Sequence, residues 1–95
     1  MFNVKIMFLS ILTDITDVEE LNLTVEDNST IRNILNQLAS KFGAKFKEMI
    51  YKTSSDLSKY VLITVNGKHI RLLEGLETII QAHDEISFIP AIAGG

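Results

Sequence analysis

The 95-residue chain contains no cysteine and only one proline, and its positive charge is limited. The absence of cysteine excludes disulfides, thiolate catalysis and cysteine-based metal sites on this chain, and it fits a cytoplasmic protein. Nine Lys and Arg stand against twelve Asp and Glu, which gives a formal net charge of −3. Because phosphate binding needs clustered basic side chains, we do not expect nucleic acid as a partner.

Long hydrophobic runs are missing as well. The most apolar segment, residues 1–12, contains Lys5, lacks a basic leader and is too short to cross a bilayer. We therefore interpret it as a strand and expect no membrane partner. With 46% apolar residues, the chain is sufficient for one domain around a single core.

Hydrophobic periodicity predicts the elements of this domain. Period-two alternation and turn signals predict strands over 2–12, 21–25, 61–65, 68–72 and 84–89. A 3.6-residue period predicts a helix from Ile31 to Phe42, preceded by capping residues and ended by Gly43, where a left-handed cap is expected. A shorter helical piece follows over 44–52. Asn66-Gly67 is the favoured pair for a type I′ hairpin.

The order of elements is strand, strand, helix, strand, short strand, strand. The apolar stripe of the helix needs one face of a sheet for burial, which predicts an α+β fold. Long apolar runs in the first and last strands favour central positions, with the last strand lying parallel to the first.

The first strand carries apolar residues on both faces. Phe8 belongs to one face, and Met7, Leu9 and Ile11 lie on the other. A strand with one solvated face should alternate throughout. The second face is therefore either covered by the chain's own loops, the commoner arrangement, or open to a partner.

Several polar groups are weak candidates for a site. The acidic segment 13–20 lacks the glycine and closing glutamate of a calcium loop, and it is interpreted as a hairpin loop. His69 and His83 lack metal-ligand spacing, so no metal site is expected. Lys68, His69 and Arg71 form a small basic cluster that could pair with an acidic partner residue.

The end of the sequence has an unusual pattern. An apolar strand runs into Pro90, after which Ala91, Ile92 and Ala93 lead to Gly94 and Gly95. Proline donates no backbone hydrogen bond, so strand pairing tends to end there, and the two glycines let another protein approach the backbone from both sides. Chance could also produce a Gly-Gly end. We expect a folded domain over 1–90 and a flexible tail over 91–95.

Four pieces of sequence together resemble the ubiquitin-like β-grasp sulfur carriers, and above all the small, sulfur-carrying subunit of molybdopterin synthase. They are the apolar first strand with Met7-Phe8, the turn 65–68, the acidic turn 83–86 and the C-terminal run 88–95. The resemblance implies a mixed sheet of four to five strands packed on one main helix, with an extended C-terminal tail.

Two positions depart from the pattern of these carriers. Pro90-Ala91 stands where they usually have two prolines, and Ala82-His83 replaces the Asp-Gly before their last strand. The missing glycine predicts a left-handed conformation for His83. Thiamine-pathway carriers, transfer-RNA-thiolating carriers and protein modifiers share this terminus, so the subfamily stays open. A β-grasp interaction domain that binds without covalent chemistry is the alternative of another class.

The resemblance implies that the Gly95 carboxylate is the reacting group. An E1-like partner would adenylate it with ATP, and sulfur from a donor would then replace the adenylate to leave a thiocarboxylate. The tail, Pro90 to Gly94, would thread into the large subunit of molybdopterin synthase. The catalytic groups would lie on these partners, so the chain would bind no cofactor and act as a carrier subunit.

Docking of such a tail requires a surface on the domain. The candidates are Met7, Phe8, Ile70, Phe88 and Ile89, together with Pro90 and Ile92 of the tail. Plain core packing is the alternative for Phe8 and Phe88. For Ile89 and Ile92 a partner contact is favoured, because exposed isoleucines near a terminus need cover.

Overall fold

The structure, a computed structural model, describes residues 1–53 and 56–91. It contains a five-stranded mixed sheet in the order β2-β1-β5-β3-β4. The strands are β1 (Phe2–Phe8), β2 (Glu20–Val25), β3 (Val61–Val65), β4 (Lys68–His69) and β5 (Glu85–Pro90). β5 pairs in parallel with β1 and antiparallel with β3, so the predicted central, parallel placement of the last strand is confirmed.

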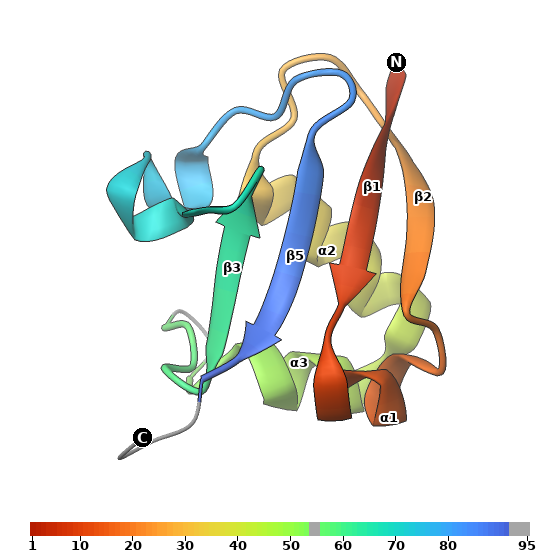
Figure 1. The fold of residues 1–95 in the computed structure, drawn as a ribbon, viewed down its shortest axis with the longest axis vertical. Coiled ribbons are helices and arrows are strands. Elements are labelled where there is room, and N and C mark those ends of the chain that lie inside the picture. The colour runs from red at the N-terminus through yellow and green to blue at the C-terminus, as the bar shows by residue number, and fades with distance from the viewer. Residues whose placement is uncertain (54–55, 92–95) are drawn as a thin grey trace.

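The main helices cover one face of this sheet. Figure 1 shows α2 (Ile31–Phe42) and α3 (Ala44–Ile50) behind the strands, with the short α1 (Thr13–Thr16) beyond the end of β1. Both predicted helical segments are therefore confirmed, and α2 starts and ends as expected. Gly43, between them, has the expected positive φ of +82°, but its ψ of −156° lies outside the left-handed helical region.

The core lies between the helices and the sheet. Ile31, Ile34, Leu35 and Leu38 form the buried stripe of α2. Beside them, four phenylalanines pack ring against ring near the end of β1: Phe8, Phe42, Phe46 and Phe88. Burial of large aromatic and aliphatic side chains of this kind contributes most of the stability of a small domain.

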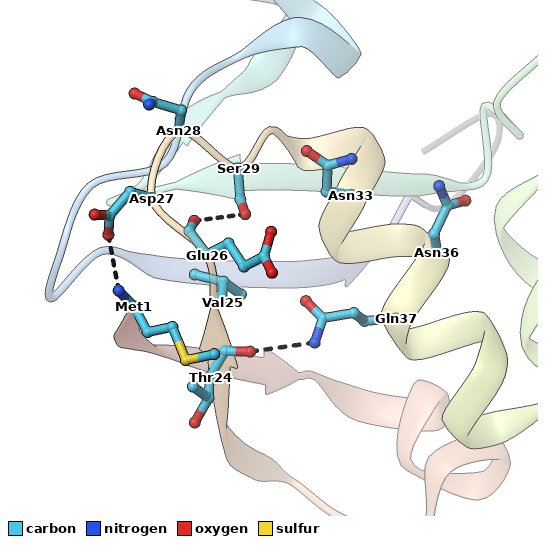
Figure 2. A pocket seen from close by; sticks show the side chains of 10 residues that line it. All are labelled: Met1, Thr24, Val25, Glu26, Asp27, Asn28, Ser29, Asn33, Asn36 and Gln37. Atoms are coloured by element: carbon cyan, nitrogen blue, oxygen red, sulfur yellow. Dashed lines mark hydrogen bonds and ion pairs between the residues drawn. The ribbon is translucent and has the colours of Figure 1, made fainter.

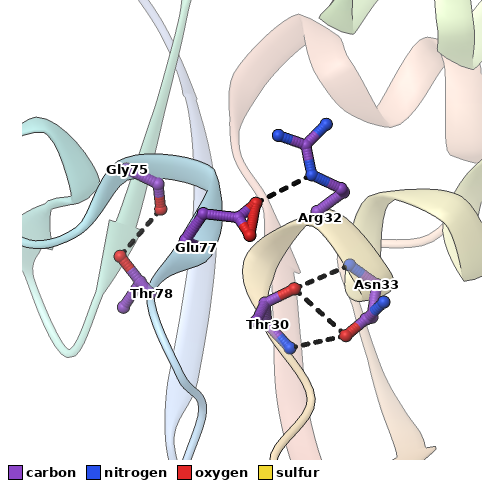
Figure 3. A network of polar contacts seen from close by, with 6 residues as sticks. All are labelled: Thr30, Arg32, Asn33, Gly75, Glu77 and Thr78. Carbon is purple, nitrogen blue, oxygen red and sulfur yellow. Dashed lines mark hydrogen bonds and ion pairs between the residues drawn. The ribbon is translucent and has the colours of Figure 1, made fainter.

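The start of α2 is fixed by a capping box. The Asn33 N–H donates to Thr30 Oγ1 at 3.3 Å, and the Thr30 N–H donates to Asn33 Oδ1 at 2.9 Å. Arg32 also pairs with Glu77 at 2.8 Å, which joins the helix to the 3₁₀ turn η3 (Gly75–Glu77) (Figure 3). These contacts hold the segment before β5 against the helix.

Two turns enter strands with positive φ, as the sequence predicts. Asn66 and Gly67 have φ of +53° and +85°, consistent with a type I′ hairpin between β3 and β4. His83 has φ of +70°, which confirms the left-handed conformation expected where a glycine is missing. The Asn66 amide links the two turns, since Asn66 Nδ2 donates to Asp84 Oδ1 at 2.9 Å.

The first strand is shorter than predicted, and the next segment is not a plain loop. β1 ends at Phe8, because Ser10 takes φ of +56° and starts the 3₁₀ turn η1 (Ser10–Leu12). The expected hairpin loop over 13–20 contains α1, which ends at Asp17 with φ of +62°. Ser10, at the start of η1, and Asp17, at the end of α1, are the left-handed residues that turn the chain out of β1 and back toward β2.

Candidate functional site

The tail leaves the domain at the end of β5. The Ala91 N–H donates to the Tyr60 carbonyl at 2.8 Å, one residue beyond the last strand pair, Val61 with Pro90. We call Tyr60, Pro90 and Ala91 the tail base. Ile92, Ala93, Gly94 and Gly95, which the sequence assigns to the reacting tail, lie outside the described residues. Four residues can reach at most about 13–14 Å from Ala91.

The register explains why proline is tolerated at the tail base. Residues of an antiparallel pair alternate between bonded and non-bonded positions. Tyr60 with Ala91 is a bonded pair, so Val61 with Pro90 is a non-bonded one, and the missing N–H of Pro90 removes no bond to β3. On the other side of β5, pairing with β1 ends at Phe8 with Phe88, before Pro90 is reached.

An apolar groove of about 740 Å³ lies beside the tail base. It is lined by residues of α1, α3, η1 and the ends of β3 and β5: Ile11, Leu12, Ile15, Lys45, Glu48, Met49, Ser58, Tyr60, Val61, Pro90 and Ala91. Ile11 and Tyr60 are 68% and 56% exposed, so the groove presents apolar surface to solvent. The sequence alone did not predict this groove, because its walls come from four separate segments.

The face of the sheet opposite the helices carries a second apolar group. Met7, Leu62 and Ile89 lie on adjacent strands and are each partly exposed, and we call this group the open-face patch. Leu62 stands directly across from Ile89. Met7 and Ile89 were candidate docking residues, whereas Leu62 was missed. Its signal was present in the sequence, since Leu62 is the apolar residue on the otherwise polar face of the strand 61–65.

Three other predicted docking residues lie inside the domain. Phe8, Ile70 and Phe88 are 2%, 4% and 0% exposed, so their expected place on a docking surface is wrong. Phe8 and Phe88 stack on each other, with ring centroids 5.2 Å apart, on the face covered by the helices. The sequence could not separate core from interface at these three positions, since large apolar side chains are common in both.

The apolar residues after β1 are exposed rather than covered. Leu9 and Ile11 are 37% and 68% exposed, so cover by the chain's own loops, the commoner arrangement, is wrong for this pair. The chain turns at Ser10, and Ile11 therefore joins the groove beside the tail base instead of the sheet face.

A polar pocket of about 500 Å³ occupies the opposite end of the molecule. Figure 2 shows that it is lined by the N-terminal residue, the end of β2, the following turn and α2. The Met1 ammonium pairs with Asp27 at 3.0 Å there, and both groups are largely exposed. Because β1 and β5 are parallel, this pocket and the tail base are at opposite ends of the sheet. It therefore belongs to a different region from the tail.

The weak polar candidates have structural places. Within residues 1–53 and 56–91, no three His, Asp or Glu side chains come together as metal ligands. His69 Nδ1 accepts a hydrogen bond from the Arg71 N–H at 2.9 Å. His83 is the left-handed residue, with φ of +70°, in the turn before β5. Among the same described residues, no helix is long and apolar enough to cross a membrane.

The sheet order and the tail base can be compared with known proteins. The family model named ThiS matches residues 6–95. The chain belongs to the ThiS family. A protein of Archaeoglobus fulgidus described as a sulfur carrier is 38% identical over 74 residues, which cover 78% of this chain and 84% of the relative.

Solved structures agree with this membership. The small archaeal modifier protein 1 of Methanosarcina acetivorans is 31% identical, with a TM-score of 0.81, and the match covers 100% of this chain and 98% of that chain. A structure from Pyrococcus furiosus, named as subunit 1 of a molybdopterin converting factor, has a TM-score of 0.79 at 18% identity, covering 97% and 100% of the two chains. At that identity the likeness concerns the fold alone.

These matches confirm the resemblance to ubiquitin-like β-grasp sulfur carriers. The fold expected from the sequence, a mixed sheet packed on one main helix, is confirmed as well. The chain is therefore a member of a family of sulfur carriers and ubiquitin-like modifiers.

Proposed function

We propose that the chain is a sulfur carrier whose reacting group is the Gly95 carboxylate. An E1-like enzyme adenylates this carboxylate with ATP and releases pyrophosphate. A sulfur nucleophile supplied by a donor then attacks the carbonyl carbon, adenosine monophosphate leaves, and a thiocarboxylate remains. The ATP is bound by the activating partner, and this chain binds no cofactor of its own.

The family match through residue 95 is the observation that carries this proposal, because it includes the terminal Gly94-Gly95 pair. The geometry of the tail base supports it. A backbone hydrogen bond to Tyr60 fixes the chain as far as Ala91, and an apolar groove lies beside it. A partner protein could therefore bind the tail base while the last four residues extend into the partner's active site. Glycines at the tip leave the carbonyl open to attack.

Intact-mass spectrometry tests the activation step. The full chain, incubated with ATP, a cognate E1-like enzyme and a sulfide source, should gain about 16 Da as sulfur replaces oxygen. A chain that ends at Gly94 should show no gain, because its carboxylate lies about 3.5 Å short of the reacting position. The exposed substitution Lys47→Ala should keep the gain. An unchanged mass of the full chain with an active enzyme would refute the proposal.

We propose molybdopterin biosynthesis as the pathway that receives the sulfur. The apolar first strand, the acidic turn before β5 and the terminal run support the large subunit of molybdopterin synthase as the acceptor partner. The thiocarboxylated chain, mixed with that subunit and a sulfur-free pterin precursor, should yield the dithiolene product and return its ordinary mass. Transfer to a thiamine precursor or to transfer RNA instead would reassign the pathway and keep the carrier role.

Protein modification is a second candidate function. The relative with 31% identity over the whole chain is named a small archaeal modifier protein. The same adenylate would then react with a lysine amine and form an isopeptide bond. Digests of cell extracts should contain lysines that carry the C-terminal residues of this chain. Their absence under conditions that produce the thiocarboxylate would exclude this role.

A further inference from the structure

The two sides of β3 differ in their hydrogen bonding. The Asn66 N–H donates to the Glu85 carbonyl, and the Ala91 N–H donates to the Tyr60 carbonyl, both at 2.8 Å. These bonds show that even-numbered residues on this strand bond to β5. Because the backbone direction alternates along a strand, Val61 and Ile63 direct their N–H and C=O groups to the side away from β5.

On that side β3 is only partly covered. β4 is two residues long and pairs with Thr64 and Val65 alone. In Figure 1, β3 is the last long strand on its side of the sheet, with the turns around residues 70–77 beyond one end. Within the described ranges 1–53 and 56–91, no strand pairs with Val61 on this side. An uncovered edge of this kind is a template for another extended chain.

A groove of about 230 Å³ follows the uncovered edge. Leu57 and Ile70 supply apolar lining, and Lys59, His69 and Arg71 supply the charged and polar lining. Among the described residues that line it, none is acidic, although the whole chain has a formal charge of −3. His69 Nδ1 accepts the Arg71 N–H, so Nε2 is the ring nitrogen left to donate to a guest.

We propose that this groove binds an extended, acidic segment of another protein, which adds to the sheet as a strand along residues 59–63. The backbone of Val61 would supply hydrogen bonds independent of the guest's sequence, whereas Ile63 lies across from Ile70 when the register of β3 with β4 is continued by one residue. Leu57 and Leu62, both partly exposed, would take an apolar guest residue, and Lys59 and Arg71 would pair with carboxylates beside it. We call this region the β3 edge.

The opposite edge of the sheet supports this choice of partner. Along and beside β2 lie Glu19, Glu20 and Glu26, and no Lys or Arg lies within residues 19–26. An acidic segment is repelled there and attracted at the β3 edge. The proposal does not depend on the sulfur chemistry. Since Tyr60 also holds Ala91, a segment bound at the β3 edge would lie beside the tail base.

Titration with capped peptides tests the proposal. The probe is Glu-Asp-Val-Thr-Val-Asp-Glu, followed by backbone amide chemical shifts of the full chain. Shifts should concentrate on residues 59–63, and hydrogen exchange of the Val61 N–H should slow. A peptide with N-methyl groups on Thr and the second Val cannot pair in either register, and its affinity should fall at least tenfold. A peptide with Lys in place of every acid should bind at least tenfold more weakly as well.

Charge reversal on the protein gives the matched comparison. Lys59→Glu combined with Arg71→Glu should weaken binding of the acidic peptide at least tenfold. The double change Lys41→Glu with Lys47→Glu alters the net charge equally on the helices and should change affinity less than threefold. All four residues are exposed, but Lys41 and Lys47 lie in the last turns of α2 and α3, where a carboxylate opposes the helix dipole, so binding is measured well below the Tm of each variant. Shifts along β2, equal binding of the N-methylated peptide, or no binding at millimolar peptide would each overturn the proposal.

Discussion

The two faces of the sheet are built from the same strands and differ in their use. On β5, Ile86 and Phe88 point to the helices and are 0% exposed, whereas Ile89 points to the other face and is partly exposed. β1 repeats this contrast with Ile6 and Met7. Successive side chains of a strand lie on opposite faces, so one segment can serve both the core and a surface.

This contrast separates stability from recognition. The covered face buries its apolar side chains under α2 and α3, which makes the fold self-sufficient. The open-face patch and the groove beside the tail base keep apolar surface in contact with water, both next to the end of β5. Apolar surface that the fold does not need to bury is typical of a region that binds partners.

The largest effect is expected from a change under the covered face. Phe46→Ala removes a fully buried ring that contacts Phe8, Phe42 and Phe88. The free energy of unfolding should fall by about 3–5 kcal/mol, because the cavity adds to the lost transfer energy. Urea unfolding, followed by far-UV circular dichroism, measures this change.

The matched control is Ile11→Ala in the groove beside the tail base. Ile11 is 68% exposed, so its truncation should change the free energy of unfolding by about 0.5 kcal/mol or less. Similar losses for the two variants would contradict the separation between covered and open regions.

A substitution in the open-face patch should have a smaller effect, and it should weaken partner binding rather than destabilise the fold. Ile89→Asp places a carboxylate directly across from Leu62 in the open-face patch, where a partner of the tail would pack. Affinity for the E1-like enzyme should fall at least tenfold, about 1.4 kcal/mol. Surface plasmon resonance measures it. Asn22→Asp adds the same charge on the same face at β2 and should leave affinity within twofold. Equal losses would mean that charge alone, not the patch, matters.

The sequence predicted the sheet, its central parallel pair and the span of α2, because periodicity and turn chemistry are local signals. It also predicted the conformation of His83 from a missing glycine. It failed on Phe8 and Phe88, since alternation assigns residues to a face but not to the core or the surface. The groove beside the tail base was missed because Ile11, Met49 and Tyr60 meet only in three dimensions.

A third, smaller effect concerns how firmly the covering helix is held. Thr30→Ala removes the hydroxyl that accepts the Asn33 N–H in the capping box. The free energy of unfolding should fall by about 1 kcal/mol. Ser40→Ala removes an exposed hydroxyl within the same helix and should change it by less than about 0.5 kcal/mol. Thermal unfolding of both variants measures the difference. A loss with Ser40→Ala as large as with Thr30→Ala would argue against the cap.

The smallest effect on stability is expected at the turn before β5, which contains His83. His83 has φ of +70°, which costs a non-glycine residue about 1–2 kcal/mol, while glycine costs about 0.5–1 kcal/mol in chain entropy. His83→Gly should therefore stabilise the domain by about 0.5 kcal/mol, a rise in Tm of about 2–4 °C. Ala82→Gly, next to it and without positive φ, should lower Tm instead. If both glycines destabilised equally, the left-handed turn would not be strained. Neither change alters a side chain on the sheet, so activation of the tail should stay the same in both variants.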